Sequence, residues 1–302
     1  MKVYRSEKAR KGIMDTYDKL LAMWDTEFIE SGIPTLYGST HVIQCGKPGN
    51  PPLVLFHGVG DDSALMWLYN AKELARHFMV YAIDTIGGPG KSVPNRNYDK
   101  GFDDARWIDE VLAGLKLEKV YLAGVSNGAY ITQYYGLHRP ERVLKMVCMA
   151  GTVPAGDYNP MKIMIKVFLP EALLPTKKNT YKLMQKMCGK NSGVFTENPV
   201  IMEHYRFLLK GFNNMSMSHH NLGNFNDGQI DAIRDKTLYL MGDADPFAIM
   251  GGKDALVKHK MKALFFPEVG HGLNHEIADA VNRIIVEYFT NQRGEECAWT
   301  LF

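Results

Sequence analysis

The chain has 302 residues, of which 46% are hydrophobic and 23% charged, so it has enough apolar material for a large folded core, which excludes intrinsic disorder. Its 35 basic and 33 acidic side chains give a formal charge of +2, which excludes the broad basic field that drives non-specific binding to nucleic acid. We therefore expect no nucleic-acid partner.

Short apolar runs bounded by Gly, Pro or Asp predict strands, and several of these runs are apolar on both faces. In chain order they cover 41–45, 52–56, 78–83, 120–124, 143–149, 237–241 and 263–266. Helices are predicted over the first thirty residues and over 63–76, 102–116, 127–138 and 274–289. This alternation predicts an α/β fold with a mainly parallel, doubly wound sheet that is covered on both faces.

One long segment interrupts the alternation. Residues 153–232 contain no convincing strand but five prolines and seven of the 17 methionines. We expect this segment to be a helical cap inserted into a core made of residues 1–152 and 233–302, lying over the carboxyl edge of the sheet, where such folds bind ligands. Met161 and Met164 are candidates for an adaptable apolar substrate pocket, although ordinary core of the cap also explains the methionines.

A serine flanked by glycines follows the strand predicted over 120–124. The run Gly124-Val125-Ser126-Asn127-Gly128 leads directly into the helix predicted over 127–138. A serine on such a tight strand-to-helix turn has strained backbone geometry and a projecting hydroxyl, and it needs small residues two places to either side. Ser126 is therefore a candidate nucleophile, and the alternative is an ordinary glycine-rich turn.

A serine hydroxyl is a weak nucleophile, so it needs a histidine to take its proton and a carboxylate to orient that histidine. His271 follows the strand predicted over 263–266, and two carboxylates, Asp243 and Asp245, follow the strand over 237–241. Since the carboxyl ends of parallel strands share one edge of the sheet, we expect these side chains to lie near Ser126.

The choice between the two carboxylates stays open on spacing alone. Asp243 and Asp245 are two residues apart, so both point the same way if the segment is extended. Pro246 favours an extended Asp245.

On these motifs the sequence resembles the α/β-hydrolase superfamily, in particular its esterase-like branch of bacterial carboxylesterase-type serine hydrolases. The resemblance covers residues 38–290 and is carried by His57-Gly58-Val59-Gly60, Asp84 to Ser92, Gly124 to Gly128, Gly242 to Asp245 and Gly270-His271-Gly272. The combination is specific, whereas each motif alone is not.

This resemblance implies roles for individual residues. Ser126 is implied as the nucleophile, Asp245 as the acid of the catalytic triad and His271 as the general base. The backbone N–H groups of Val59 and Asn127 are implied as the oxyanion hole. The resemblance also implies that no metal or organic cofactor is needed.

Other motifs are weaker. Gly90-Lys91-Ser92 matches the end of a phosphate-binding P-loop, but Thr85 stands where that motif needs glycine and Pro94 interrupts the helix that should follow. The histidines of the insertion lack a metal-ligand pattern and are expected to be packed or exposed. Its seven lysines between 162 and 190 predict a solvated face, or attraction to an acidic substrate or membrane surface.

Two residues near these motifs are expected to have supporting roles. His57 precedes the loop of the implied oxyanion hole and is predicted to order that loop through hydrogen bonds rather than to act as a base. Asp84 ends a predicted strand, but its loop precedes Ser126 in the chain, so we assign it a structural role.

The sequence therefore predicts a serine hydrolase that cleaves a carboxylic ester of a small to medium apolar acyl group through an acyl-enzyme, or alternatively a thioester, lactone or amide. The same scaffold also serves C–C bond hydrolases, perhydrolase or haloperoxidase-like enzymes, acyltransferases and lyases. A non-catalytic ligand-binding homologue usually lacks a residue of the triad, and none is missing here.

The expected location follows from the N-terminus and the cysteines. Charged residues are spread through the first eight positions and no apolar signal segment follows, and no apolar run approaches the roughly 20 residues of a bilayer span. Cys45, Cys148, Cys188 and Cys297 show no CxxC spacing, which is typical of a reducing compartment without structural zinc. We expect a cytoplasmic protein, either a monomer or a homodimer.

Overall fold

A central sheet organises the computed structural model, which describes residues 2–155, 165–167, 169, 171, 173–220 and 223–290. In this part of the chain nine strands form one sheet in the order β1-β2-β4-β3-β6-β7-β8-β9, and β5 pairs with β2. The strands are β1 Phe28–Thr35, β2 Gly38–Cys45, β3 Pro52–Phe56, β4 Met79–Ile83, β5 Val93–Pro94, β6 Val120–Val125, β7 Val143–Met149, β8 Thr237–Gly242 and β9 Lys262–Phe266.

The direction of the strands confirms the predicted sheet. From β4 through β3, β6, β7 and β8 to β9 every neighbouring pair is parallel. The pairs β1–β2, β2–β4 and β2–β5 are antiparallel. The carboxyl ends of β3, β6, β8 and β9 therefore lie along one edge of the sheet.

The prediction of a helix over the first thirty residues is wrong at its end. Helix α1 covers Glu7–Leu21, but the chain then forms β1, which is joined to β2 by a hairpin whose Gly38 has a φ of +138°. Of the residues in β1 only Ile33 is buried, because this strand lies at the edge of the sheet. An edge strand with a single buried side chain gives no apolar run that sequence patterning could detect.

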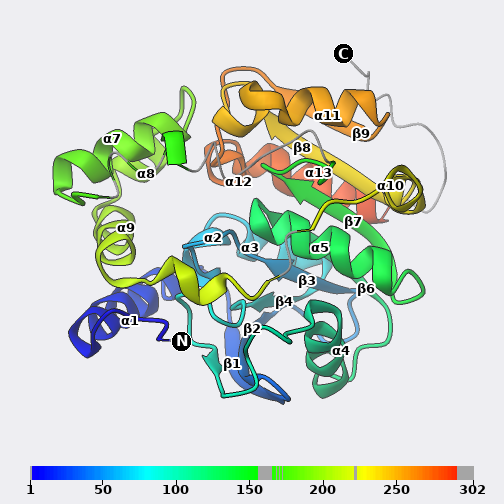
Figure 1. The fold of residues 1–302 in the computed structure, drawn as a ribbon, viewed down its shortest axis with the longest axis horizontal. Coiled ribbons are helices and arrows are strands. Elements are labelled where there is room, and N and C mark those ends of the chain that lie inside the picture. Colours follow the sequence, from blue (N-terminus) through cyan, green and yellow to red (C-terminus); the bar gives the residue numbers. More distant parts are fainter. Residues whose placement is uncertain are drawn as a thin grey trace.

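Helices cover both faces of the sheet (Figure 1). Besides α1 they are α2 Ser63–Met66, α3 Ala71–His77, α4 Asp104–Gly114, α5 Asn127–His138, η2 Ala248–Gly252, α11 Lys253–Lys258, α12 Leu273–Glu276 and α13 Ala278–Thr290. Alternate residues of one strand pack into different cores: Leu53 and Leu55 contribute to the core with α1, α3 and α13, and Val54 and Phe56 to the core with α4 and α5. The central strands are thus buried on both faces, as their apolar sequences indicate.

The described part of the insertion between β7 and β8 contains helices and no strand. These helices are α7 Lys177–Met187, α8 Gly193–Thr196, α9 Pro199–Gly211, η1 Asn214–Met217 and α10 Asp227–Arg234. Figure 1 shows α7, α8 and α9 together on one side of the sheet, with α1 next to α9. Met161 and Met164 lie outside the described residues.

A buried ion pair joins this insertion to the loop after β3. Nε2 of His204, on α9, lies 2.8 Å from Oδ2 of Asp62, and its Nδ1 lies 2.7 Å from the hydroxyl of Thr16 on α1. The next residue, Tyr205, donates a hydrogen bond from its hydroxyl to Asp61 at 3.2 Å. Burial, together with the charge of Asp62, raises the pKa of Asp61 to about 7. Buried polar contacts thus connect α1, α9 and the β3 loop.

Replacing His204 with leucine is expected to lower the free energy of unfolding by about 3–5 kcal/mol, because Asp62 would keep a buried carboxylate without its partner. The double variant His204→Leu/Asp62→Asn should lose less, because no uncompensated charge remains and asparagine can still cap α2. Urea unfolding followed by tryptophan fluorescence measures both values. A double variant that is less stable than the single one would contradict this account of the pair.

Candidate active site

Ser126 lies on a strained turn between β6 and α5. Its φ of 55° and ψ of −115° place a non-glycine residue in a region that L-residues rarely adopt. The turn is held by a hydrogen bond of 2.8 Å from the Ser126 amide to the carbonyl of Met149 in β7. The hydroxyl is thereby presented at the carboxyl edge of the sheet.

The two glycines around Ser126 are required by close packing. A Cβ on Gly124 would overlap the carbonyl of Gly128, the second residue of α5. A Cβ on Gly128 would overlap the carbonyl of Phe56, at the end of β3. Only glycine at both positions lets α5 start this close to the two strands, which is the physical reason for the Gly-x-Ser-x-Gly pattern.

The two candidate acids after β8 have different environments. Asp245 is fully buried, and its Oδ1 accepts a hydrogen bond of 2.8 Å from the amide of Phe247. Asp243 instead forms an ion pair of 2.7 Å with Lys253 at the surface, where its side chain is 37% exposed. The geometry therefore favours Asp245 as the partner of a histidine, in agreement with what the resemblance implies.

His271 meets Asp245 across the ends of β8 and β9. Its Nδ1 lies 2.9 Å from Oδ2 of Asp245, and the ring centre lies 4.7 Å from that of Phe247. Because a carboxylate only accepts hydrogen bonds, the neutral imidazole in this contact carries its proton on Nδ1 and its lone pair on Nε2. Phe247 could not be identified from the sequence, because its position two residues after Asp245 does not by itself predict a contact with the His271 ring.

Among the described residues no hydrogen bond links the Ser126 hydroxyl to His271. In unliganded enzymes such catalytic hydrogen bonds are often long and shorten only when substrate is bound. The two residues share an edge because β6, β7, β8 and β9 are consecutive parallel strands.

The loop after β3 runs past Ser126. A Cβ on Gly58 would lie 3.4 Å from the Cβ of Ser126, so the next residue in the loop, Val59, lies near Ser126. Neither the Val59 amide nor the Asn127 amide donates a hydrogen bond to another described residue. Asn127 is the first residue of α5, where helical N–H groups are unpaired and favour negative charge. Both amides are thus available donors, as an oxyanion hole requires.

His57 orders this loop, which confirms its predicted supporting role. The amide of Thr85 donates to Nε2 of His57 at 2.8 Å, so Nδ1 carries the proton and donates to the carbonyl of Gly58, also at 2.8 Å. Burial lowers the pKa of this fully buried imidazole, which keeps it neutral.

Asp84 is the centre of a second buried network and has the predicted structural role. It accepts hydrogen bonds from the Tyr17 hydroxyl at 2.9 Å and from the Lys91 amide at 2.7 Å, and it lies 2.9 Å from Nδ1 of His41. Despite its burial, these contacts hold the pKa of Asp84 well below its ordinary value, with His41 as the main cause. The chain at Lys91 therefore wraps a carboxylate, as a phosphate-binding loop would not.

The histidines of the insertion have protein partners, as expected. Nδ1 of His220 lies 2.5 Å from Asp104, and its Nε2 lies 2.8 Å from the carbonyl of Ile86. Within the described ranges no three His, Cys, Asp or Glu side chains gather as a metal site would require. In the same ranges no helix has both the length and the apolar composition to cross a bilayer.

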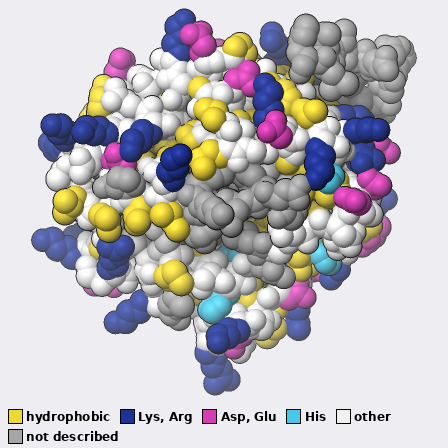
Figure 2. All heavy atoms as spheres, turned by 45° about the horizontal axis from the view of Figure 1, so that its top comes forward, with side chains coloured by type: hydrophobic (Ala, Val, Ile, Leu, Met, Phe, Trp, Pro, Cys, Tyr) yellow, Lys and Arg dark blue, Asp and Glu magenta, His cyan; other side chains and the backbone are white. Residues whose placement is uncertain are grey.

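The lysines described between 166 and 190 are exposed, as a solvated face requires. Figure 2 shows several Lys and Arg side chains toward the left edge of the molecule, the side on which α7 lies in Figure 1. The exposed lysines of this segment include Lys177, Lys178, Lys182, Lys186 and Lys190.

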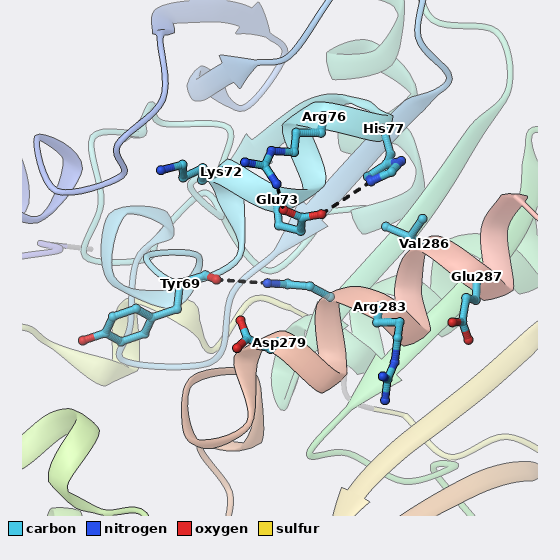
Figure 3. A pocket seen from close by; sticks show the side chains of 10 residues that line it. Tyr69, Lys72, Glu73, Arg76, His77, Asp279, Arg283, Val286 and Glu287 are labelled. Atoms are coloured by element: carbon cyan, nitrogen blue, oxygen red, sulfur yellow. Dashed lines mark hydrogen bonds and ion pairs between the residues drawn. The ribbon is translucent and has the colours of Figure 1, made fainter.

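A groove of about 620 Å³ lies between α3 and α13 (Figure 3). Charged side chains of both signs line it, and Glu73 pairs with Arg76 at 2.6 Å and with His77 at 3.5 Å. None of the sequence-predicted site residues lines this groove.

Comparison with known proteins gives one family. A model of the alpha/beta hydrolase fold family matches residues 51–276. The chain is 26% identical over 287 residues, 92% of each chain, to a Bacillus subtilis protein named uncharacterized carboxylesterase nap. It is 36% identical over 144 residues, 48% of each chain, to carboxylesterase YbfK of the same organism.

A solved structure has the same fold. The crystal structure of naproxen esterase (carboxylesterase NP) from Bacillus subtilis superposes with a TM-score of 0.81. The alignment covers 94% of this chain and 99% of that chain at 24% sequence identity. At this identity the likeness is evidence for the fold alone.

Proposed function

This chain belongs to the alpha/beta hydrolase fold family, and on that premise we propose that it is a serine hydrolase that cleaves a carboxylic ester through an acyl-enzyme intermediate. The carboxylesterase names of two relatives support cleavage of esters. The observation that carries the proposal is the hydrogen bond between Asp245 and His271 at the sheet edge that also presents Ser126. A buried carboxylate that fixes the imidazole tautomer is what a serine needs to become a nucleophile.

In the acylation step, the Ser126 hydroxyl oxygen attacks the carbonyl carbon of the ester while Nε2 of His271 takes the hydroxyl proton. Asp245 keeps the imidazole oriented and stabilises the imidazolium. The amides of Val59 and Asn127 donate to the oxyanion that develops, and each such donor lowers the barrier by about 3 kcal/mol. The alcohol leaves with the proton held on His271.

In the deacylation step, His271 takes a proton from water, which attacks the acyl carbon bound to Ser126. The tetrahedral oxyanion again accepts hydrogen bonds from the two amides. Its collapse releases the carboxylic acid, and Ser126 regains its proton from His271. His271 carries each proton transfer in this route, and the backbone amides donate hydrogen bonds only.

We further propose that residues 153–232 form the cap that selects the acyl group. Support comes from the position of α7, α8 and α9 beside the sheet, and the methionine-rich composition of this segment favours an apolar group of small to medium size. Replacement of Met161 or Met164 with alanine is expected to shift the preferred acyl length. Unchanged chain-length profiles in both variants would count against their part in the pocket.

Turnover of p-nitrophenyl esters from acetate to decanoate tests the proposed reaction. We expect the highest kcat/KM for short to medium chains, with a decline toward decanoate as the acyl group outgrows the pocket. Vinylogous diketones serve as a parallel panel for C–C bond hydrolysis. A folded protein that turns over the diketones and none of the esters would overturn the proposed ester substrate.

We also propose that the enzyme acts in the cytoplasm as a monomer or a homodimer. Cys45, Cys148 and Cys188 are buried free thiols, which supports a reducing compartment. Cell fractionation and sedimentation velocity measure the location and the oligomeric state. Recovery in a secreted fraction, or a sedimenting species larger than a dimer, would contradict the proposal.

A further inference from the structure

The loop that carries His271 is bound directly to the segment that follows α7. The amide of His271 donates to the carbonyl of Met187, the last residue of α7, at 2.6 Å. The amide of Lys190 donates in the other direction, to the carbonyl of Glu268, at 2.8 Å. The backbone of the candidate general base is therefore held by the insertion as well as by the sheet.

Glycines bring these two segments into backbone contact. A Cβ on Gly189 would overlap the carbonyl of Glu268, and a Cβ on Gly270 would overlap the carbonyl of Met187. A Cβ on Gly272 would come within 2.7 Å of the ring of Phe195, on α8. Because side chains at these positions would force the segments apart, the two segments are in direct contact, and we expect a displacement of the insertion to move the loop.

The carboxylate of Glu276 bridges the two segments. Its Oε1 accepts a hydrogen bond of 2.9 Å from the amide of Gly270, directly before His271. Its Oε2 accepts one of 2.8 Å from the amide of Gly189, two residues after α7. The side-chain amide of Asn191 adds a hydrogen bond of 3.2 Å to the carbonyl of Glu276. The buried carboxylate of Glu276 thus accepts one backbone hydrogen bond from the insertion and one from the loop of His271.

A carboxylate is the side chain that can do this, because both of its oxygens accept hydrogen bonds. Burial raises the pKa of Glu276, whereas the amides of Gly189 and Gly270 act in the opposite direction since they favour the ionised form. Burial of a carboxylate costs free energy unless such bonds are made. Here both hydrogen bonds come from backbone amides, one in the insertion and one in the loop of His271.

We propose that Glu276 is a positioning residue that fixes the insertion to the loop of His271, so that the place of the insertion sets the alignment of the general base. Asp245 and Phe247 contact the imidazole, whereas Glu276 acts on the backbone that carries it. This inference rests on the proposed serine hydrolase function. The position of the acyl-selecting segment thereby affects the step in which His271 transfers a proton. In such a step a misplacement of about 1 Å can lower the rate by up to 100-fold.

The variant Glu276→Gln tests the bridge. Glutamine has the same size, but its single carbonyl oxygen accepts from one amide and its NH₂ group faces the other, so one hydrogen bond is lost. We expect kcat for p-nitrophenyl butyrate to fall about 10-fold, with KM changed less than about 3-fold, because the alignment of His271 and not the binding of substrate is disturbed. A wild-type kcat in a folded variant would overturn the positioning role.

Glu268→Gln is the matched control. It makes the same chemical change eight residues earlier in the chain, in the loop of His271, but the Glu268 carboxylate is 70% exposed and, among the described residues, pairs only with Lys190, at 3.4 Å. Its kcat should stay within about 2-fold of wild type, because a solvent-exposed ion pair contributes little. An equal loss in both variants would attribute the effect to loop charge and overturn the role of Glu276.

Hydrogen exchange provides a readout that does not depend on turnover. In Glu276→Gln, peptides covering 187–192 and 268–272 should exchange faster together, while peptides from α13 keep their wild-type rates. Unchanged exchange in both segments would overturn the proposal, and so would an equal increase in α13, which would indicate a purely structural role. Absence of ester turnover in the wild type would contradict the proposed function, while the exchange result would still decide whether Glu276 joins the segments.

Discussion

Replacement of Ser126 with alanine is expected to lower kcat for p-nitrophenyl butyrate by about 10⁶-fold, with KM changed little. The hydroxyl is the atom proposed to form the acyl-enzyme, and the strained turn between β6 and α5 presents it at the sheet edge where Asp245 and His271 meet. Steady-state kinetics with purified, folded protein measure the loss. The residual rate should reflect only the oxyanion hole and substrate binding.

Ser218→Ala is the matched control for this variant. Ser218 is an exposed serine of the insertion, just after η1, and its backbone amide donates a hydrogen bond to the carbonyl of Met215. Its kcat should stay within about 2-fold of wild type. Turnover by Ser126→Ala within about 10-fold of wild type would show that another group is the nucleophile.

A second large effect is expected from Asp245→Asn, which should lower kcat by about 10⁴-fold. The carboxylate accepts a hydrogen bond from Nδ1 of His271 at 2.9 Å, whereas the amide of asparagine can donate to Nδ1 and so favour the tautomer that protonates Nε2. An imidazole in that tautomer cannot take the proton of Ser126. Stopped assays over hours at high enzyme concentration are suited to a loss of this size.

Asp243→Asn gives the comparison, because it is the same change two residues away. Asp243 pairs with Lys253 at the surface, so kcat should stay within about 3-fold of wild type. The two variants together decide a choice that spacing alone left open. A larger loss in Asp243→Asn than in Asp245→Asn would contradict the assignment of the acid.

The sheet and its edge could be predicted from sequence because their signals are local. The apolar runs at 52–56, 120–124 and 143–149 are strands in the structure, and the parallel order follows from burial on both faces. Ser126 directly follows one predicted strand and His271 lies in the loop after another, which is why they could be placed on one edge. Asp245 needed the resemblance to a family, since Asp243 satisfies the same spacing.

The contacts that hold the insertion could not be predicted. Glu276 falls within a run of helical spacing, 274–289, and nothing in that pattern marks its two backbone partners across the molecule. The same holds for Asp62 and His204, which are 142 residues apart and meet only after the insertion has folded onto α1 and the β3 loop. Long-range polar contacts have no periodicity, so sequence patterning gives no sign of them.

Through these two sets of contacts the insertion binds both of the loops that we propose to take part in catalysis. On one side His204 and Tyr205 bind Asp62 and Asp61, shortly after Val59 in the β3 loop. On the other side the segment after α7 binds the loop of His271. The segment that we propose to select the acyl group is thus attached both to the loop of the proposed oxyanion hole and to the loop of the proposed general base.

We expect Ser126, as an activated nucleophile, to react with a fluorophosphonate. Such reagents form a stable bond with a serine only when a neighbouring base and oxyanion donors activate it. Intact-mass analysis, followed by peptide mapping, should find one phosphonyl adduct on wild type, located at Ser126, and none on Ser126→Ala. An unmodified wild type, or an equal adduct on both proteins, would show that Ser126 is not an activated nucleophile.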